Sequence, residues 1–320
     1  DDNGRLWLAT NSKGIYVLDF KNNIEYNIIP SEIELNLVDI LHDHTSTIYL
    51  AAFKNGVYTL DSDLKNLQKV TNEGSNLAVT LLEDSKENIW VAFEDGIAMI
   101  DEKRENMITL PEDTGFTLNF STDIKEDTSG AIWFCSFQDN KVVSLSLQKK
   151  KVKLLSNENG YALSGSTRIE EDSNGNMWIV GNNEVYILSK NKQRSKTIGI
   201  NSRMLTNRRG SILKRKDGTI WIGSLDKGIL ITNDFTLKTE YFDTSRGLIN
   251  DEVWEIEEDS RGNLWLGTVG GINIIDPKNK TIKALPHELL HSTFKNTVLK
   301  IEEIKQDIFF IDAVWGFSIL

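Results

Sequence analysis

Residues 258–268 read Glu-Asp-Ser-Arg-Gly-Asn-Leu-Trp-Leu-Gly-Thr, and this phrase decides the fold because the chain repeats it. An acidic pair is followed by a polar turn containing glycine, and then by an apolar strand built around one aromatic residue. Eight copies occur along the chain, about 43 residues apart, which is the spacing of a structural repeat. The anchor aromatic residues of the eight copies are Trp7, Tyr49, Trp90, Trp133, Trp178, Trp221, Trp265 and Phe309.

Each copy is predicted to contain four short antiparallel strands. Apolar and polar residues alternate with a spacing of two, and clusters of Gly, Asn, Asp and Ser separate the alternating runs. In the seventh copy the predicted strands are Val253–Glu257, Leu264–Thr268, Ile272–Ile275 and Thr281–Leu285. A small sheet must cover both of its faces, and a radial arrangement of such sheets achieves this. The chain is therefore predicted to be an all-β β-propeller of four-stranded antiparallel blades.

We expect a single propeller of seven blades over residues 1–320, with eight blades as the alternative. In the seven-bladed version the strand Thr297–Glu303 completes the first blade, whose other strands begin at Leu6, Ile15 and Glu25. Residues 307–320 are then left over, as an eighth blade or as the start of a second propeller. The innermost strands are predicted to begin near Val38, Val79, Asp123, Thr167, Gly210, Val253 and Val298, and the anchor aromatic residues are predicted to be buried between sheets.

Composition, charge and cysteine content narrow the class of protein and of partner. Hydrophobic residues make up 39% of the chain and charged residues 26%, which is ordinary for a globular protein. The net charge of −11 opposes non-specific binding to nucleic acid or anionic lipid, although an electropositive groove on one face stays open. The single cysteine, Cys135, has no partner for an internal disulfide. Asp1-Asp2-Asn3-Gly4 does not resemble a signal peptide, and the chain opens inside a repeat, so we expect a piece of a larger protein.

The phrase Asp-Ser-x-Gly-Asn-Leu-Trp-Leu-Gly-Thr-x-Gly-Gly-Ile resembles the two-component regulator propeller repeat, and the copies around Trp178, Trp221 and Trp265 match it best. Departures include Tyr49 and Phe309 in place of Trp, and Ala51-Ala52 in place of Gly-Thr. This family forms the periplasmic sensor regions of hybrid two-component systems in Bacteroidetes. The resemblance implies a periplasmic module that detects an extracellular signal, commonly an oligosaccharide released from a complex glycan. The repeat motif itself is structural and transfers no binding residue.

A ligand site is expected on the face that carries the connectors into the innermost strands and the hairpins between second and third strands. These loops share one face because successive strands reverse direction, and the Asp-x-x-Gly turns take the other face. Variable loops on a rigid scaffold are where specificity is usually built. The candidate ligand-binding residues combine cationic forks, an amide and a flat apolar surface: Arg208, Arg209, Asn250 and Trp254.

No catalytic residue, metal ligand or cofactor is predicted. The acidic turns at Asp1, Asp127 and Asp172 look like halves of calcium loops, but no copy supplies the closing glutamate, and a β-turn explains them. His287-Glu288-Leu289-Leu290-His291 fits the zinc-protease pattern HExxH without an evident third ligand.

Three functions stay open from the residues. A non-catalytic sensor propeller leads, and its expected partners are an oligosaccharide or other small ligand, neighbouring sensor domains and a second copy as a homodimer. Membrane contact is expected only through missing parts of the parent chain. The second function is a propeller enzyme, a polysaccharide lyase or glycosidase, which converging carboxylates with shifted pKa values would favour. The third is a protein-interaction scaffold.

Overall fold

The computed structural model divides the chain into two compact units, Asp1–Ala162 and Leu163–Leu320. The units are described separately below. The structure describes residues 1, 4–9, 14–22, 24–28, 36–53, 55–61, 66–70, 77–94, 96–104, 107–109, 121–136, 138–148, 151–161, 163, 165, 168–191, 195–199, 211–233, 238–279, 281–285, 297–313 and 316–320. Within this part of the chain, no helix has the length and apolar character needed to cross a membrane.

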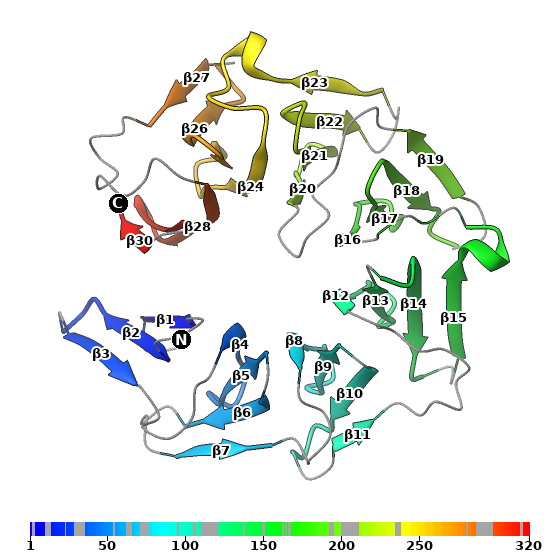
Figure 1. Ribbon diagram of the computed structural model, residues 1–320, viewed down its shortest axis with the longest axis vertical. Coiled ribbons are helices and arrows are strands. Elements are labelled where there is room, and N and C mark those ends of the chain that lie inside the picture. Colours follow the sequence, from blue (N-terminus) through cyan, green and yellow to red (C-terminus); the bar gives the residue numbers. More distant parts are fainter. Residues whose placement is uncertain are drawn as a thin grey trace. The chain divides into compact units, whose positions relative to one another are not determined.

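The first unit contains four antiparallel sheets in chain order (Figure 1). The first has three strands and the others have four. Their strands are β1 (Arg5–Ala9), β2 (Ile15–Asp19) and β3 (Ile24–Ile28); β4 (Leu37–His42), β5 (Ile48–Ala52), β6 (Gly56–Leu60) and β7 (Leu67–Lys69); β8 (Ala78–Glu83), β9 (Ile89–Phe93), β10 (Gly96–Ile100) and β11 (Met107–Thr109); β12 (Ser121–Glu126), β13 (Ile132–Ser136), β14 (Lys141–Ser146) and β15 (Lys151–Ser156).

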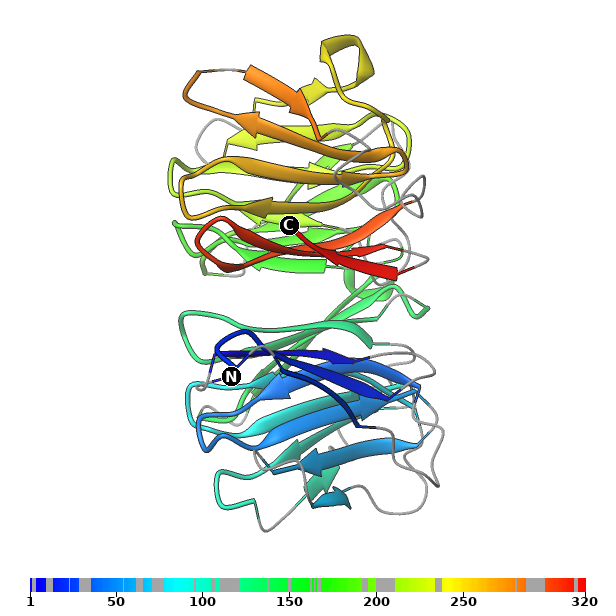
Figure 2. The same ribbon diagram turned by 90° about the vertical axis from the view of Figure 1, so that its left-hand side faces the viewer.

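The second unit also contains four antiparallel sheets, the last of which has three strands. Their strands are β16 (Arg168–Glu171), β17 (Met177–Val180), β18 (Glu184–Leu188) and β19 (Ser195–Gly199); β20 (Ile212–Lys214), β21 (Thr219–Gly223), β22 (Ile229–Asn233) and β23 (Glu240–Phe242); β24 (Val253–Glu258), β25 (Leu264–Thr268), β26 (Gly271–Asp276) and β27 (Thr281–Ala284); β28 (Val298–Lys305), β29 (Ile308–Ala313) and β30 (Gly316–Ile319). Within each unit the sheets stack on one another, as Figure 2 shows from the side.

The architecture is that of a β-propeller with eight blades, so the preference for seven was wrong. The strand β28 does not complete the first sheet in the described structure; it pairs with β29, and β29 pairs with β30. The physical reason is local: a two-residue turn at Gln306 and Asp307 joins β28 to β29, with Asp307 at a φ of 63°. A hairpin closed by so short a turn forms more easily than a pairing between distant strands. A single propeller over residues 1–320 remains a prediction.

The predicted innermost strands are confirmed to within two residues at Val38, Val79, Asp123, Val253 and Val298. The predicted starts at Thr167 and Gly210 lie outside the described residues, and β16 and β20 are described from Arg168 and Ile212. First strands of neighbouring sheets contact one another, as β4 and β8 do in the first unit and β24 and β28 in the second. Five of them carry a β-bulge near their start, between Leu37 and Asp39 for example, and between Val253 and Glu255. A bulge twists the strand and redirects the following side chains.

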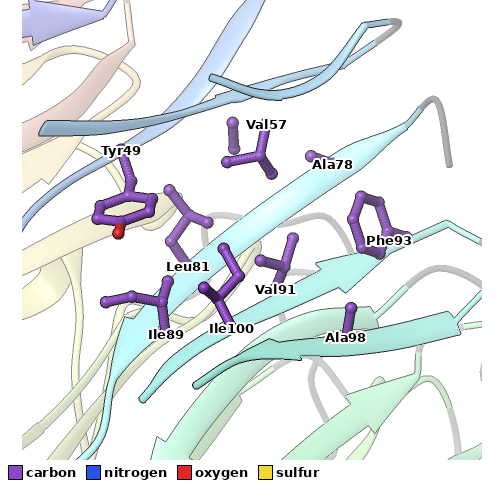
Figure 3. Close-up of a cluster of buried hydrophobic side chains, with 10 residues drawn as sticks. Tyr49, Val57, Ala78, Leu81, Ile89, Val91, Phe93, Ala98 and Ile100 are labelled. Atoms are coloured by element: carbon purple, nitrogen blue, oxygen red, sulfur yellow. The ribbon is translucent and has the colours of Figure 1, made fainter. Parts of the chain in front are cut away.

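The anchor aromatic residues pack between sheets, as predicted. Seven of the eight are buried, and Trp7 is half-buried. Tyr49 belongs to the buried cluster between the sheets β4–β7 and β8–β11, which also contains Leu81, Val91 and Phe93 (Figure 3). Burying a large aromatic side chain removes much apolar surface from water, so each anchor contributes substantially to the docking of neighbouring sheets.

The two residues of the acidic pair in the repeat have different structural roles. The aspartate accepts a hydrogen bond from the indole N–H of the anchor six residues later. The Nε1···Oδ2 distance is 2.8 Å for Trp90 and Asp84 and 2.8 Å for Trp133 and Asp127. The same pairing joins Trp7 to Asp1, Trp178 to Asp172 and Trp265 to Asp259. The aspartate therefore satisfies the one polar atom of a buried tryptophan.

The glutamate of the acidic pair joins one sheet to the preceding one, in a contact that we call the inter-sheet clip. Glu126, at the end of β12, accepts hydrogen bonds from the backbone N–H of Ser85 at 2.7 Å and from its hydroxyl at 2.6 Å. Glu303 accepts the same two bonds from Ser260, at 2.5 and 2.9 Å. In both clips the donor is the residue that follows the turn aspartate.

Glycine in the anchor strand allows the next innermost strand to approach closely. A Cβ atom at Gly267 would lie 2.9 Å from Cγ1 of Val298 and 3.0 Å from its carbonyl oxygen. At Gly223 it would lie 2.6 Å from the carbonyl oxygen of Val253. The glycine of the repeat phrase is therefore required here by contact with the start of the following innermost strand.

Candidate ligand-binding surface

A hydrogen-bonded connector precedes β24 and orders the loop where two of the predicted site residues lie. It contains a short 3₁₀ turn, Thr244–Arg246, capped at its start by the Asp243 side chain. The Asp251 carboxylate accepts from the backbone N–H of Thr244 at 2.7 Å. The buried Asn273 amide on β26 accepts from the backbone N–H of Ile249 at 2.9 Å. Hydrogen bonds thus hold the connector near both of its ends.

Asn250 and Trp254 meet through Glu252. The side-chain oxygen of Asn250 accepts from the backbone N–H of Glu252 at 2.8 Å, and the indole N–H of Trp254 donates to the Glu252 carboxylate at 3.0 Å. Both residues are half-buried. Trp254 is the extra residue of the bulge at the start of β24, which separates it from the regular alternation. The other two predicted site residues, Arg208 and Arg209, lie outside the described residues.

The residue that follows Trp254 belongs to a charged pair that the sequence analysis missed. Glu255 on β24 and Lys300 on β28 form an ion pair at 3.6 Å, with 14% of the Glu255 side chain and 50% of the Lys300 side chain exposed. Burial raises the pKa of Glu255 to about 7, against the opposing effect of Lys300. Burial also raises the pKa of Glu257, the next residue but one on the strand. Desolvation acts to lower the pKa of Lys300, but the nearby carboxylates outweigh it and raise that pKa.

This group of side chains can exchange hydrogen bonds with a polar ligand near neutral pH. A carboxyl group with a pKa near 7 is present in both protonation states, so it can donate or accept. The ammonium group of Lys300 donates only. Asn250, Trp254, Glu255 and Lys300 are hereafter called the β24 surface. It combines an amide, an aromatic face, a titrating acid and a cation.

The acidic turns are structural, as predicted for the β-turn interpretation. The glycines of the turns at Asp1, Asp127 and Asp172 have φ between 73° and 80°. One oxygen of Asp127 accepts from the backbone N–H groups of Ser129 and Ala131, and the other accepts from the indole of Trp133. Their carboxylates are therefore engaged by the protein.

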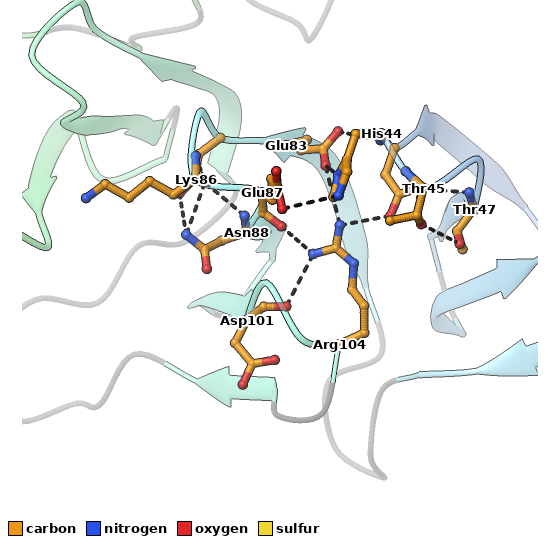
Figure 4. A network of polar contacts seen from close by, with 11 residues as sticks. His44, Thr45, Thr47, Glu83, Lys86, Glu87, Asn88, Asp101 and Arg104 are labelled. Atoms are coloured by element: carbon orange, nitrogen blue, oxygen red, sulfur yellow. Dashed lines mark hydrogen bonds and ion pairs between the residues drawn. The ribbon is translucent and has the colours of Figure 1, made fainter. Parts of the chain in front are cut away.

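One group among the described residues has the donor atoms for a metal ion: Asp43, His44 and Glu83, whose ligand atoms lie within 4.8 Å of one another. Arg104, however, already pairs with two members of the group (Figure 4). Its guanidinium lies 2.9 Å from Asp43 and 3.4 Å from Glu83. The other Asp43 oxygen accepts from Thr45 and Thr47. These hydrogen bonds and ion pairs occupy acceptors that a cation would need. The HExxH residues 287–291 lie outside the described part of the chain.

Arg104 and Asp43 also explain how one blade tolerates Tyr49 in place of tryptophan. Tyrosine has no indole N–H, so the turn aspartate of this copy lacks its usual donor. Arg104 supplies one from the β10–β11 turn, and its guanidinium lies 5.8 Å from the centre of the Tyr49 ring. Burial raises the pKa of Tyr49 to about 12.

Comparison with known proteins places the β24 surface largely inside a recognised repeat. Residues 247–270 match the model of the two component regulator propeller. No curated protein sequence matches the chain.

Among solved structures, virginiamycin B lyase from Staphylococcus aureus is 16% identical, with a TM-score of 0.63 over 91% of this chain and 96% of the lyase. The extracellular domain of a putative one component system from B. thetaiotaomicron is also 16% identical, with a TM-score of 0.52 over 100% of this chain. This chain spans 52% of that domain. PorZ, a surface component of the type-IX secretion system of Porphyromonas gingivalis, is 11% identical, with a TM-score of 0.60 over 99% of this chain and 57% of PorZ.

These likenesses show the β-propeller fold. The match of residues 247–270 agrees with the resemblance to the two-component regulator propeller repeat that the sequence showed. Asn250, Trp254 and Glu255 lie within the matched residues 247–270. Residues 247–270 of this β-propeller therefore match the two component regulator propeller repeat.

Proposed function

We propose that this chain is the ligand-sensing propeller of a hybrid two-component signalling system, acting in the periplasm without catalysis. The observation that carries the proposal is the match of residues 247–270 to the two-component regulator propeller repeat. The extracellular domain from B. thetaiotaomicron, which has the same fold, supports it. The rest of that system, including a kinase, would lie outside this chain.

The proposed ligand is an oligosaccharide derived from a glycan, bound on the β24 surface. Sugar rings present C–H groups to aromatic faces and hydroxyl groups to carboxylates and amides. Trp254 offers the aromatic face, and Glu255, Lys300 and Asn250 offer the polar groups. Arg208 and Arg209 remain predictions for the recognition of an anionic sugar, because a guanidinium binds sulfate or carboxylate in two-point fashion.

Calorimetric titration of a panel of neutral, sulfated and uronate oligosaccharides tests this function. Trp254→Ala is expected to weaken binding of the active oligosaccharide about tenfold, since an aromatic anchor at a binding surface contributes about 1–2 kcal/mol. Phe20→Ala is the matched control, because Phe20 is an exposed aromatic residue of the first unit. Equal binding by the wild-type protein and Trp254→Ala would contradict the proposed surface. No binding by any member of the panel would contradict the sugar as ligand.

A propeller lyase or glycosidase is the second candidate, because Glu255 and Glu257 both have raised pKa values. Glu255 would act as the general base or acid. Mass spectrometry of each oligosaccharide after incubation with the protein distinguishes the two functions. A sensor returns the ligand intact. An enzyme yields cleaved product, which Glu255→Gln abolishes while binding persists.

A further inference from the structure

The inter-sheet clip between the second and third sheets contains a titratable donor. In the clips formed by Ser85 and Ser260, a hydroxyl and a backbone N–H bind the glutamate of the next sheet. His44 takes the equivalent position in the second sheet. Its backbone N–H donates to one oxygen of Glu83 at 3.1 Å, and its ring Nδ1 lies 2.5 Å from the other oxygen. The imidazole therefore replaces the hydroxyl of the ordinary clip.

Both ring nitrogens of His44 face carboxylates. While Nδ1 contacts Glu83, Nε2 lies 3.2 Å from the carboxylate of Glu87. A carboxylate only accepts hydrogen bonds, so each nitrogen must carry a proton to bond it. A neutral imidazole carries one proton and would leave a nitrogen lone pair facing a carboxylate. The geometry thus requires the imidazolium form, independently of any titration value.

The charges around the ring come from four elements. Glu83 ends β8, Glu87 lies in the β8–β9 turn, and Asp43 precedes His44 in the β4–β5 turn. Arg104, from the β10–β11 turn, pairs with Asp43 and Glu83 rather than with the imidazole. Lys86 points away from the ring (Figure 4). Three carboxylates thus face one guanidinium, and the imidazolium is the second cation. The hydrogen bond to Glu83 and the neighbouring carboxylates raise the pKa of His44 above 6.5, in agreement with this arrangement.

We infer that His44 makes the contact between the sheets β4–β7 and β8–β11 sensitive to protons, whereas the clip between β8–β11 and β12–β15 is not. Loss of the imidazole proton removes one of the two charge-assisted bonds at the ring. The stabilisation is fully present below the ordinary histidine pKa of 6.5, and it is lost as the pH rises through the raised pKa of the folded state. Alkalinisation would therefore loosen one contact within the first unit and leave the neighbouring one unchanged.

Amide hydrogen exchange by NMR tests this inference in the whole chain. The backbone N–H of His44 and the backbone N–H of Ser85 occupy equivalent positions in two clips, so Ser85 is an internal control. After correction for intrinsic exchange, protection at His44 is expected to fall several-fold relative to Ser85 between pH 6 and pH 9. His44→Ser installs the donor of the ordinary clip and is expected to abolish this fall. EDTA in all samples removes any contribution of bound metal.

A constant ratio of protection across this pH range would overturn the inference, as would the same fall in His44→Ser. A second measurement does not depend on that variant folding. The ring resonances of His44 are expected to titrate above pH 6.5 in the wild-type protein, and at a lower pH in Glu87→Gln, which removes one carboxylate charge. Titration of His44 at or below pH 6.5 in the wild-type protein would equally refute it.

Discussion

The turn aspartate is expected to be among the most sensitive polar positions in this propeller, and Asp84→Asn tests that expectation with little change of volume. One oxygen of Asp84 accepts from the backbone N–H groups of Lys86 and Asn88, each at 2.9 Å. The other accepts from the Asn88 amide at 2.9 Å and from the Trp90 indole at 2.8 Å. An asparagine keeps one acceptor, and it places an NH₂ group opposite the other two donors.

These contacts determine how much free energy of unfolding Asp84→Asn is expected to lose. The fully buried indole N–H of Trp90 loses its acceptor, which costs about 1–3 kcal/mol for an unsatisfied buried group. The two backbone bonds lose the charge of their acceptor, at about 1 kcal/mol each. The free energy of unfolding is therefore expected to fall by about 3–5 kcal/mol in Asp84→Asn, a large part of the 5–15 kcal/mol typical of a domain.

Urea denaturation followed by far-ultraviolet circular dichroism measures this loss, and a double-mutant cycle with Trp90→Phe isolates the indole bond. The expected coupling energy between the two positions is about 1–3 kcal/mol. Thr219→Val is the matched control, because Trp221 donates to the neutral Thr219 hydroxyl at 3.1 Å, and its expected cost is about 1 kcal/mol. A coupling energy near zero, or an Asp84→Asn cost no larger than that of Thr219→Val, would refute this account of the acidic pair.

Three further predictions concern packing, charge and compensation. Gly267→Ala is expected to lower the free energy of unfolding by about 1–3 kcal/mol, because its Cβ would press on the Val298 backbone; Gly199→Ala, with open space around it, is the control in the same denaturation assay. Glu255→Gln is expected to raise the melting temperature at pH 8 but not at pH 5. The raised pKa of the Glu255 carboxyl destabilises the folded state as the pH rises from 4.5 to about 7. An equal effect at both pH values would contradict burial as the cause of this pKa. Arg104→Ala is expected to lower the free energy of unfolding by about 2 kcal/mol, because it leaves Asp43 without its cation. Adding Tyr49→Trp is expected to recover part of this loss by restoring an indole donor. Calorimetric scans of the single and double variants would show no recovery if Arg104 acted elsewhere.

The sequence predicted the strands well because each signal for them is local. The alternation around Trp265 and the glycine turn before it belong to one stretch of chain, and the structure confirms the strand there. The number of blades was harder, because Val298–Lys305 could pair either with the adjacent strand Ile308–Ala313 or with a distant strand near the N-terminus. The short turn at Gln306 and Asp307 was the deciding feature, and the absence of the usual turn glycine obscured it.

The candidate surface could be predicted only in part. Trp254 stood out as a tryptophan outside the anchor position, and Asn250 as an amide on an inner connector. Glu255 and Lys300 looked like ordinary charged strand residues. The sequence did contain an indirect indication that Glu255 and Lys300 pair. The two residues occupy equivalent positions of adjacent repeats, each just after a bulge, and carry opposite charges. Burial raises the pKa of Glu255, and the nearby carboxylates raise the pKa of Lys300. Residue type and spacing do not reveal either effect.

The direction of the inter-sheet clip has a consequence for how the chain is made. Each glutamate reaches back to a turn that lies earlier in the sequence, as Glu126 reaches to Ser85 and Glu303 to Ser260. When a chain emerges from the ribosome or from a secretion pore with its N-terminus first, the receiving turn already exists when the glutamate arrives. Each sheet can therefore template the next during biosynthesis, and whole repeats can be gained or lost by gene duplication without redesigning a junction.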